Sequence, residues 1–85
     1  MKALLLTPNP ATNKVSVVYD SATGGVTTIG VYTLAGVELM SQKVNSKIGI
    51  NKQNLNVTKL VKGVYIVKVT GGGVNSSTQL AIEKE

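Results

Sequence analysis

The chain has 85 residues and a formal net charge of +5, and it contains neither histidine nor cysteine. A chain of this length supports one hydrophobic core, so residues 1–85 are expected to form a single domain. Zinc and iron sites rely on histidine and cysteine, and calcium sites on clustered carboxylates, so no metal or other cofactor is expected from this composition.

The same composition argues against catalysis and against nucleic-acid binding. General acid–base catalysis near neutral pH draws on histidine or on a tuned pair of carboxylates, and the four acidic residues are scattered. Because serine and lysine are both present, the composition does not exclude a catalytic Ser–Lys pair, but no motif supports one. We therefore expect the chain not to be an enzyme. The positive charges are all lysines spread along the chain, whereas nucleic-acid surfaces cluster Arg and Lys beside aromatic rings. No nucleic-acid partner is expected.

The first expected strand, Ala3–Leu6, is short and is followed by a segment with two prolines, TPNPATN. Its apolar run is far below the roughly 7–15 residues of a signal-peptide core. Pro8 and Pro10 lack a backbone donor and push the residues before them toward extended geometry. An edge strand or a crossover between sheets is therefore expected here.

The segments that follow alternate apolar and polar residues. In Lys14–Asp20, the side chains of Val15, Val17 and Tyr19 fall on one face. A strand over Val26–Leu34 is expected to turn at an Ala-Gly pair, where Gly36 supplies a positive φ, and to return as a hairpin. A weaker strand comes next, and NVTKL after it is too short for a helix.

The most regular strand is Val64–Thr70, with Tyr65 and alternate valines on one face and apolar residues on the other. A strand that is apolar on both faces is typical of the middle of a sheet. The glycine triplet after it precedes another strand, which favours a hairpin over a phosphate loop, because phosphate loops lead into helices. The expected strands are Ala3–Leu6, Lys14–Asp20, Val26–Leu34, Val37–Lys43, Ile48–Leu55, Val64–Thr70 and Ser77–Glu83.

About seven strands, with turn signals roughly every ten residues, predict an all-β fold of the immunoglobulin-like antiparallel β-sandwich type. Within LVKGVYIVKV, the residues Leu60, Gly63 and Tyr65 match a tyrosine corner, in which the phenol bonds to backbone just upstream. Gly63 is expected to adopt the turn conformation that a Cβ atom would obstruct. By itself this motif indicates architecture.

Taken with its neighbours, the motif carries a family resemblance. PNPATNKV, VYTLAGVEL, LNVTKLVKGVYIVKV and QLAIEK occur in this order, and together they resemble the type IX secretion system C-terminal sorting domain, type A. The similarity runs from Pro8 to Lys84. The family pattern maps onto Pro8, Asn9, Pro10, Tyr32, Leu34, Gly36, Leu60, Gly63, Tyr65, Val69, Leu80, Ile82 and Lys84. Val37 departs from the family, which often has Lys or Arg there, and the tail is less basic because Glu83 and Glu85 flank Lys84.

The resemblance implies a sorting signal at the C-terminal end of a larger secreted parent, which enters the periplasm by its own N-terminal signal. The implied partners are the outer-membrane translocon, its shuttle β-barrel and a sortase-like peptidase that removes the domain, leaving the cargo at the cell surface or in the medium. The implied recognition residues are Pro8, Asn9, Pro10, Gly36, Gly63, Tyr65, Leu80, Ile82 and Lys84.

The alternative is an immunoglobulin-like stalk or adhesion module that binds a surface glycan or protein. Such a module needs an exposed aromatic platform or a calcium-ligand cluster. The sequence supplies neither, because Tyr19, Tyr32 and Tyr65 all lie in expected strands. Two copies of the chain could also pair through the edge strands of the sandwich and form a dimer.

Overall fold

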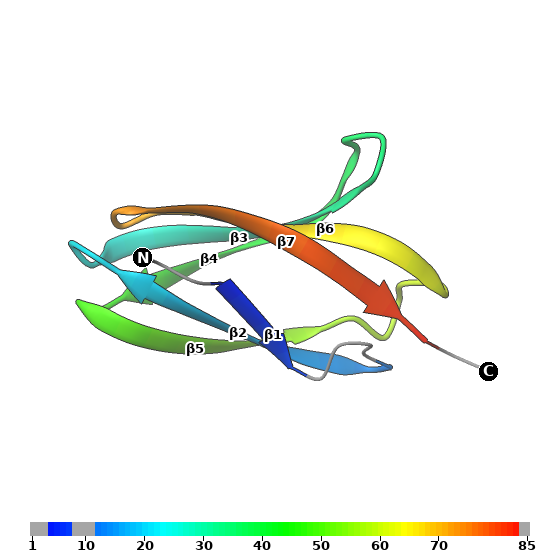
Figure 1. Ribbon diagram of the computed structural model, residues 1–85, viewed down its shortest axis with the longest axis horizontal. Coiled ribbons are helices and arrows are strands. Elements are labelled where there is room, and N and C mark those ends of the chain that lie inside the picture. The colour runs from blue at the N-terminus through cyan, green and yellow to red at the C-terminus, as the bar shows by residue number, and fades with distance from the viewer. Residues whose placement is uncertain (1–3, 8–11, 84–85) are drawn as a thin grey trace.

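The computed structural model of the chain is an all-β sandwich (Figure 1). It describes residues 4–7 and 12–83. Within these ranges, no helix long and apolar enough to cross a membrane is found. The strands are β1 (Leu4–Thr7), β2 (Lys14–Ser21), β3 (Gly25–Thr33), β4 (Glu38–Ser46), β5 (Gly49–Asn56), β6 (Gly63–Gly71) and β7 (Val74–Ile82).

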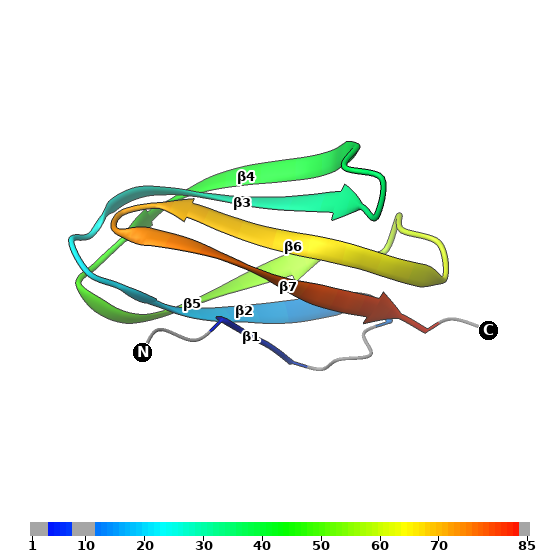
Figure 2. The same ribbon diagram turned by 45° about the horizontal axis from the view of Figure 1, so that its top comes forward.

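The strands form two antiparallel sheets that lie face to face, as Figure 2 shows. One sheet has three strands in the order β1-β2-β5, and the other has four in the order β4-β3-β6-β7. The chain changes sheet after β2, after β4 and after β5. Both β1 and β2 contact β7, which places this side of the small sheet under the β7 side of the large one. The fold predicted from the strand pattern is confirmed.

The core is built from the alternate residues of both sheets. Val15, Val17 and Tyr19 on β2 are at most 1% exposed, as their shared face predicted. Burying an aliphatic side chain of this size contributes roughly 1.5–3 kcal/mol. The large sheet contributes the other side of the core, chiefly Ile29, Val31, Val67, Val69, Leu80 and Ile82.

The predicted strands are found with shifted ends. The fourth strand extends to Ser46 instead of ending at Lys43, and the glycine triplet forms the β6–β7 hairpin as expected. Since β1 and β2 are neighbours in one sheet, the edge-strand interpretation of the N-terminal segment is confirmed and a crossover there is wrong. Pro8 and Pro10 themselves lie outside the described residues.

The strand predicted to lie mid-sheet does so, because β6 is hydrogen-bonded between β3 and β7. Its outer face, however, meets no second layer within the described chain. Val64 is 44% exposed there, and Ile66 is half-buried. The apolar outer face of this central strand is therefore partly exposed to solvent.

Hydroxyl groups tie the two sheets together at the end with the glycine hairpin. The Tyr19 hydroxyl on β2 lies 2.6 Å from Ser46 Oγ on β4, and Ser46 Oγ lies 2.7 Å from Thr27 Oγ1 on β3. Ser21 Oγ donates to the Gly72 carbonyl at 2.5 Å. Every buried side-chain nitrogen or oxygen in the described ranges has a hydrogen-bond partner, as the cost of burying polar groups requires.

Candidate recognition surface

Most of the described family-motif residues lie toward one end of the sandwich, whereas Val69 lies nearer the other. Tyr65 pairs with Leu80 on one side and with Thr33 on the other, and Gly63 pairs with Ile82. The β3–β4 hairpin rises away from the rest of the sandwich (Figure 1). Motif residues at this end are Gly36, Gly63, Tyr65, Leu80 and Ile82, whereas Pro8, Asn9, Pro10 and Lys84 lie outside the described residues.

The tyrosine corner is present as predicted. The Tyr65 hydroxyl donates to the Val61 carbonyl at 2.6 Å, and the Tyr65 side chain is only 7% exposed. Leu60, just upstream, packs against the core, and its amide donates to the Val57 carbonyl at 3.0 Å. The corner therefore fixes the loop that carries the chain from β5 in one sheet to β6 in the other.

The turn conformation expected for Gly63 is wrong. Gly63 is not among the glycines with positive φ, because it is already extended as the first residue of β6. The chain reverses direction earlier, in the 57–62 loop. A Cβ atom on Gly63 would lie 3.7 Å from Cε1 of Tyr65, an ordinary van der Waals distance. The backbone conformation at this position therefore does not require glycine.

Two of the motif residues are inaccessible in the folded domain. Leu80 is 0% exposed and Ile82 is 1% exposed, so a partner cannot contact their side chains without opening the core. They hold β7 onto the sandwich. Any recognition of the folded domain has to use other side chains at this end.

The tip of the β3–β4 hairpin presents such side chains. Gly36 has φ +91 and open space around it, which allows the tight turn that its sequence position predicted. Leu34 and Val37, on either side of the turn, are 64% and 58% exposed. No motif in the sequence assigns Val37 a contact role, although two large apolar residues flanking a turn glycine are a signal that could mark this tip.

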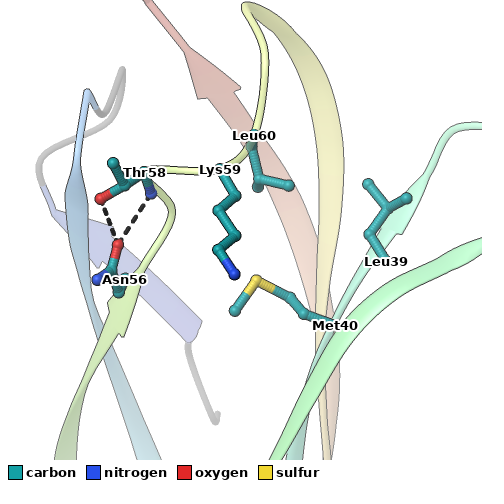
Figure 3. Close-up of a pocket in the computed structure, with 6 residues that line it drawn as sticks. All are labelled: Leu39, Met40, Asn56, Thr58, Lys59 and Leu60. Carbon is teal, nitrogen blue, oxygen red and sulfur yellow. Dashed lines mark hydrogen bonds between the residues drawn. The ribbon is translucent and has the colours of Figure 1, made fainter.

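An open groove of about 630 Å³ lies behind the hairpin, between the start of β4 and the β5–β6 loop (Figure 3). Leu39 and Met40 form one wall, and Lys59 and Leu60 face them across the groove. The remaining lining residues, Asn56 and Thr58, are joined by hydrogen bonds from the Thr58 amide and hydroxyl to Asn56 Oδ1.

The outer face of the large sheet carries one aromatic ring. Tyr32 lies across Gly30, where a Cβ atom would come within 2.8 Å of the ring, and its hydroxyl donates to Glu38 Oε1 at 3.2 Å. Lys68 Nζ lies 5.6 Å from the ring centroid, within cation–π range. Partial desolvation, with the hydrogen bond and negative charge of Glu38, raises the pKa of Tyr32 above its ordinary value.

Apolar side chains and lysine predominate at this end of the sandwich. No group of three or more His, Cys, Asp or Glu side chains that could hold a metal ion occurs within residues 4–7 and 12–83. What the end offers is apolar side chains on a rigid hairpin and loop, with lysine at the groove.

The model of the family described as secretion system C-terminal sorting domain matches residues 6–83, which covers most of the chain. No curated protein matches the chain.

Proposed function

The chain belongs to the secretion system C-terminal sorting domains of the type IX system, and we propose that its folded form is the label that the translocon reads. The family makes it a sorting-signal domain that interacts with the secretion machinery and leads to export across the outer membrane, and it indicates a non-catalytic module. The finer steps belong to the proposal. The parent protein passes through the periplasm, the translocon and a shuttle β-barrel bind the domain, and a sortase-like peptidase removes it.

The observation that carries the proposal is the exposed apolar tip of the β3–β4 hairpin at the motif-rich end. Leu34 and Val37 stand in solvent beside Gly36, in a turn closed by hydrogen bonds from the Thr33 amide to the Val37 carbonyl and from the Gly36 amide to the Thr33 carbonyl. Exposed apolar side chains that gather on a rigid element are typical of interaction sites. In this proposal Leu34 and Val37 make direct contact, whereas Tyr65, Leu80 and Ile82 act by maintaining the shape of the domain.

Residues 1–85 constitute, in this proposal, one sorting domain of a larger parent whose cargo part is separate. In the sequence, Pro8, Asn9 and Pro10 lie between β1 and β2, and Lys84 follows β7. Their family-motif positions support a role in recognition, which a C-terminal truncation tests for Lys84.

The experiment is an export assay. Residues 3–85 are fused to a periplasm-targeted fluorescent protein in a host with a working type IX system, and the fraction of reporter at the cell surface or in the medium is measured. We expect export of the fusion and loss of export with Leu34→Asp plus Val37→Asp, while the thermal melt of the isolated domain stays unchanged. Ile48→Asp plus Ile50→Asp is the matched control, since these residues are 73% and 64% exposed at the opposite end. A stable fusion that stays in the periplasm would contradict the proposed function.

A truncation separates recognition from folding at the C-terminus. Deleting Glu83–Glu85 leaves β7 intact, because the strand ends at Ile82. We expect this variant to fold cooperatively but to lose export. Normal export of the folded truncation would show that the final residues, Lys84 included, are not read.

The stalk alternative has one observation in its favour, the outward position of Tyr32 between Glu38 and Lys68. A single tyrosine whose hydroxyl is already bonded to Glu38 offers a small platform. Binding of surface glycans that is abolished by Tyr32→Ala, together with failure of export, would favour this alternative.

A further inference from the structure

β4 is an edge strand whose inner face is only partly covered by the other sheet. In the β3–β4 register, Gln42 lies opposite Ile29, and Met40 lies opposite Val31, so these pairs share the face that points toward the core. Ile29 and Val31 are at most 1% exposed, whereas Met40 is half-buried and Gln42 is exposed. The inner-face residues of β4 are therefore less buried than those of the neighbouring strand β3, because a sheet of four strands packs on a sheet of three.

Two hollows lie along the flank between β4 and β5, one toward each end. At the end with the β5–β6 loop lies the groove of Leu39, Met40 and Leu60. At the other end, a second hollow of about 600 Å³ is lined by residues of β4, β5 and the turn between them, including Asn45, Lys47 and Gln53. β4 is hydrogen-bonded on one side only, to β3, so its second side presents backbone groups along this flank.

The two hollows of this flank carry charge of one sign. Lys59 lines the first hollow, Lys47 and Lys52 line the second, and neither hollow is lined by a described Asp or Glu. On β4 itself, Lys43 is exposed opposite Thr28 on the outer face of the sheet, and Glu38 is exposed at the start of the strand. A row of lysines beside an apolar groove complements a ligand that has an apolar side chain at one end and carboxylates along its length.

We propose that the β4 edge binds an extended, acidic segment of a partner protein, which adds to the large sheet as a further strand. Its backbone pairs with β4, an apolar side chain enters the groove of Leu39, Met40 and Leu60, and its carboxylates lie near Lys43, Lys47 and Lys59. Strand addition of this kind takes affinity from main-chain hydrogen bonds and specificity from side-chain pockets. The proposal stands on the geometry of the flank and does not depend on the sorting function.

The test uses the isolated chain and a fluorescent synthetic peptide, matched to the 9 residues of β4, with a leucine at one end followed by alternating valine and glutamate. We expect saturable binding by fluorescence anisotropy, weakened by salt, with amide-exchange protection confined to β4 and the β5–β6 loop. Lys59→Glu and Leu39→Asp should each weaken binding about tenfold, a change of the size expected when one close charge pair or apolar anchor is lost.

Matched controls isolate each part of the proposal. Lys68→Glu changes the net charge as Lys59→Glu does but lies on β6, and Val64→Asp alters a residue that is 44% exposed, as Leu39 is. Neither should change the affinity. A peptide of the same sequence with alternate backbone nitrogens methylated cannot pair as a strand and should not bind.

Several outcomes would overturn the proposal. Absence of peptide binding would do so, as would equal binding of the methylated peptide, which would indicate attraction of charge alone, as for an anionic polysaccharide. Concentration-dependent dimerisation of the chain that protects β4 without peptide would assign the edge to a second copy. None of these results depends on whether the chain directs export.

Discussion

Replacing Gly71 with alanine should destabilise the domain far more than replacing Gly36, although the two glycines share nearly the same backbone conformation. Gly71 has φ +99 and Gly36 has φ +91, so the new side chain is strained in both places. Holding a non-glycine residue at positive φ costs roughly 1–2 kcal/mol. That strain is the whole expected effect at Gly36, where a Cβ atom would meet nothing within 4 Å.

At Gly71 a steric contribution is added. The Cβ atom would lie 2.6 Å from the Val26 carbonyl oxygen, which belongs to the backbone of β3 and cannot swing aside. Forcing extra atoms into a packed site costs typically about 1–3 kcal/mol. The sum for Gly71→Ala is therefore about 2–5 kcal/mol, a large part of the roughly 5–15 kcal/mol that stabilises a small domain.

Gly63→Ala completes the series as the variant without strain. Gly63 is extended, and its added Cβ would make an ordinary contact with the Tyr65 ring. Removing a glycine from the unfolded chain at such a site stabilises by about 0.4–1 kcal/mol. Urea unfolding of the three variants, followed by circular dichroism, gives the order of their free energies of unfolding. Equal losses for Gly71→Ala and Gly36→Ala, or a loss for Gly63→Ala as large as that for Gly71→Ala, would refute the reasoning.

Further substitutions test the corner, the core and the outer face. Tyr65→Phe should lower the free energy of unfolding by about 0.5–1.5 kcal/mol in urea melts, because the hydrogen bond to the Val61 carbonyl is lost. An unchanged midpoint would show that this hydrogen bond does not stabilise the fold. Leu80→Ala should cost about 2–5 kcal/mol, because its side chain is fully buried; a loss below that range would mean that the core collapses around the cavity. Tyr32 should ionise above pH 10.0 in an absorbance titration corrected with Tyr32→Phe, and Glu38→Gln should bring its pKa down. The raised pKa favours the neutral phenol in the folded state, so its stabilising effect is present below about pH 10 and is lost as pH rises through the folded pKa.

Local sequence rules were sufficient for the strands, the turns and the corner. Alternation over Val15, Val17 and Tyr19 identified a buried face, because side-chain direction alternates in any strand, whatever lies opposite. A glycine such as Gly36 between apolar runs marked a turn, because only glycine adopts positive φ without strain. The Tyr65 hydroxyl reaches the carbonyl of Val61 a few residues upstream, so this bond also belongs to local sequence.

The same rules failed where the environment of a residue is set by distant strands. Gly63 sits next to a turn in the sequence, and only the pairing of Gly63 with Ile82 shows that β6 has already begun there. Leu80 and Ile82 are different, because alternation along β7 already indicates the burial that the structure shows. Their family pattern is compatible with either role, since a residue that shapes a recognised surface and one that touches the partner are equally required.

The sequence by itself determined seven strands, their faces and the family, because these depend on residue order and on the short range of backbone sterics. Only the tertiary structure decided which apolar residues stay in solvent. Met40 and Val31 are both apolar and share one face, yet Val31 is fully buried and Met40 is not, since the small sheet ends before it reaches β4. Whether an apolar residue is exposed depends on what packs against it from the other sheet, and the small sheet has no strand opposite Met40.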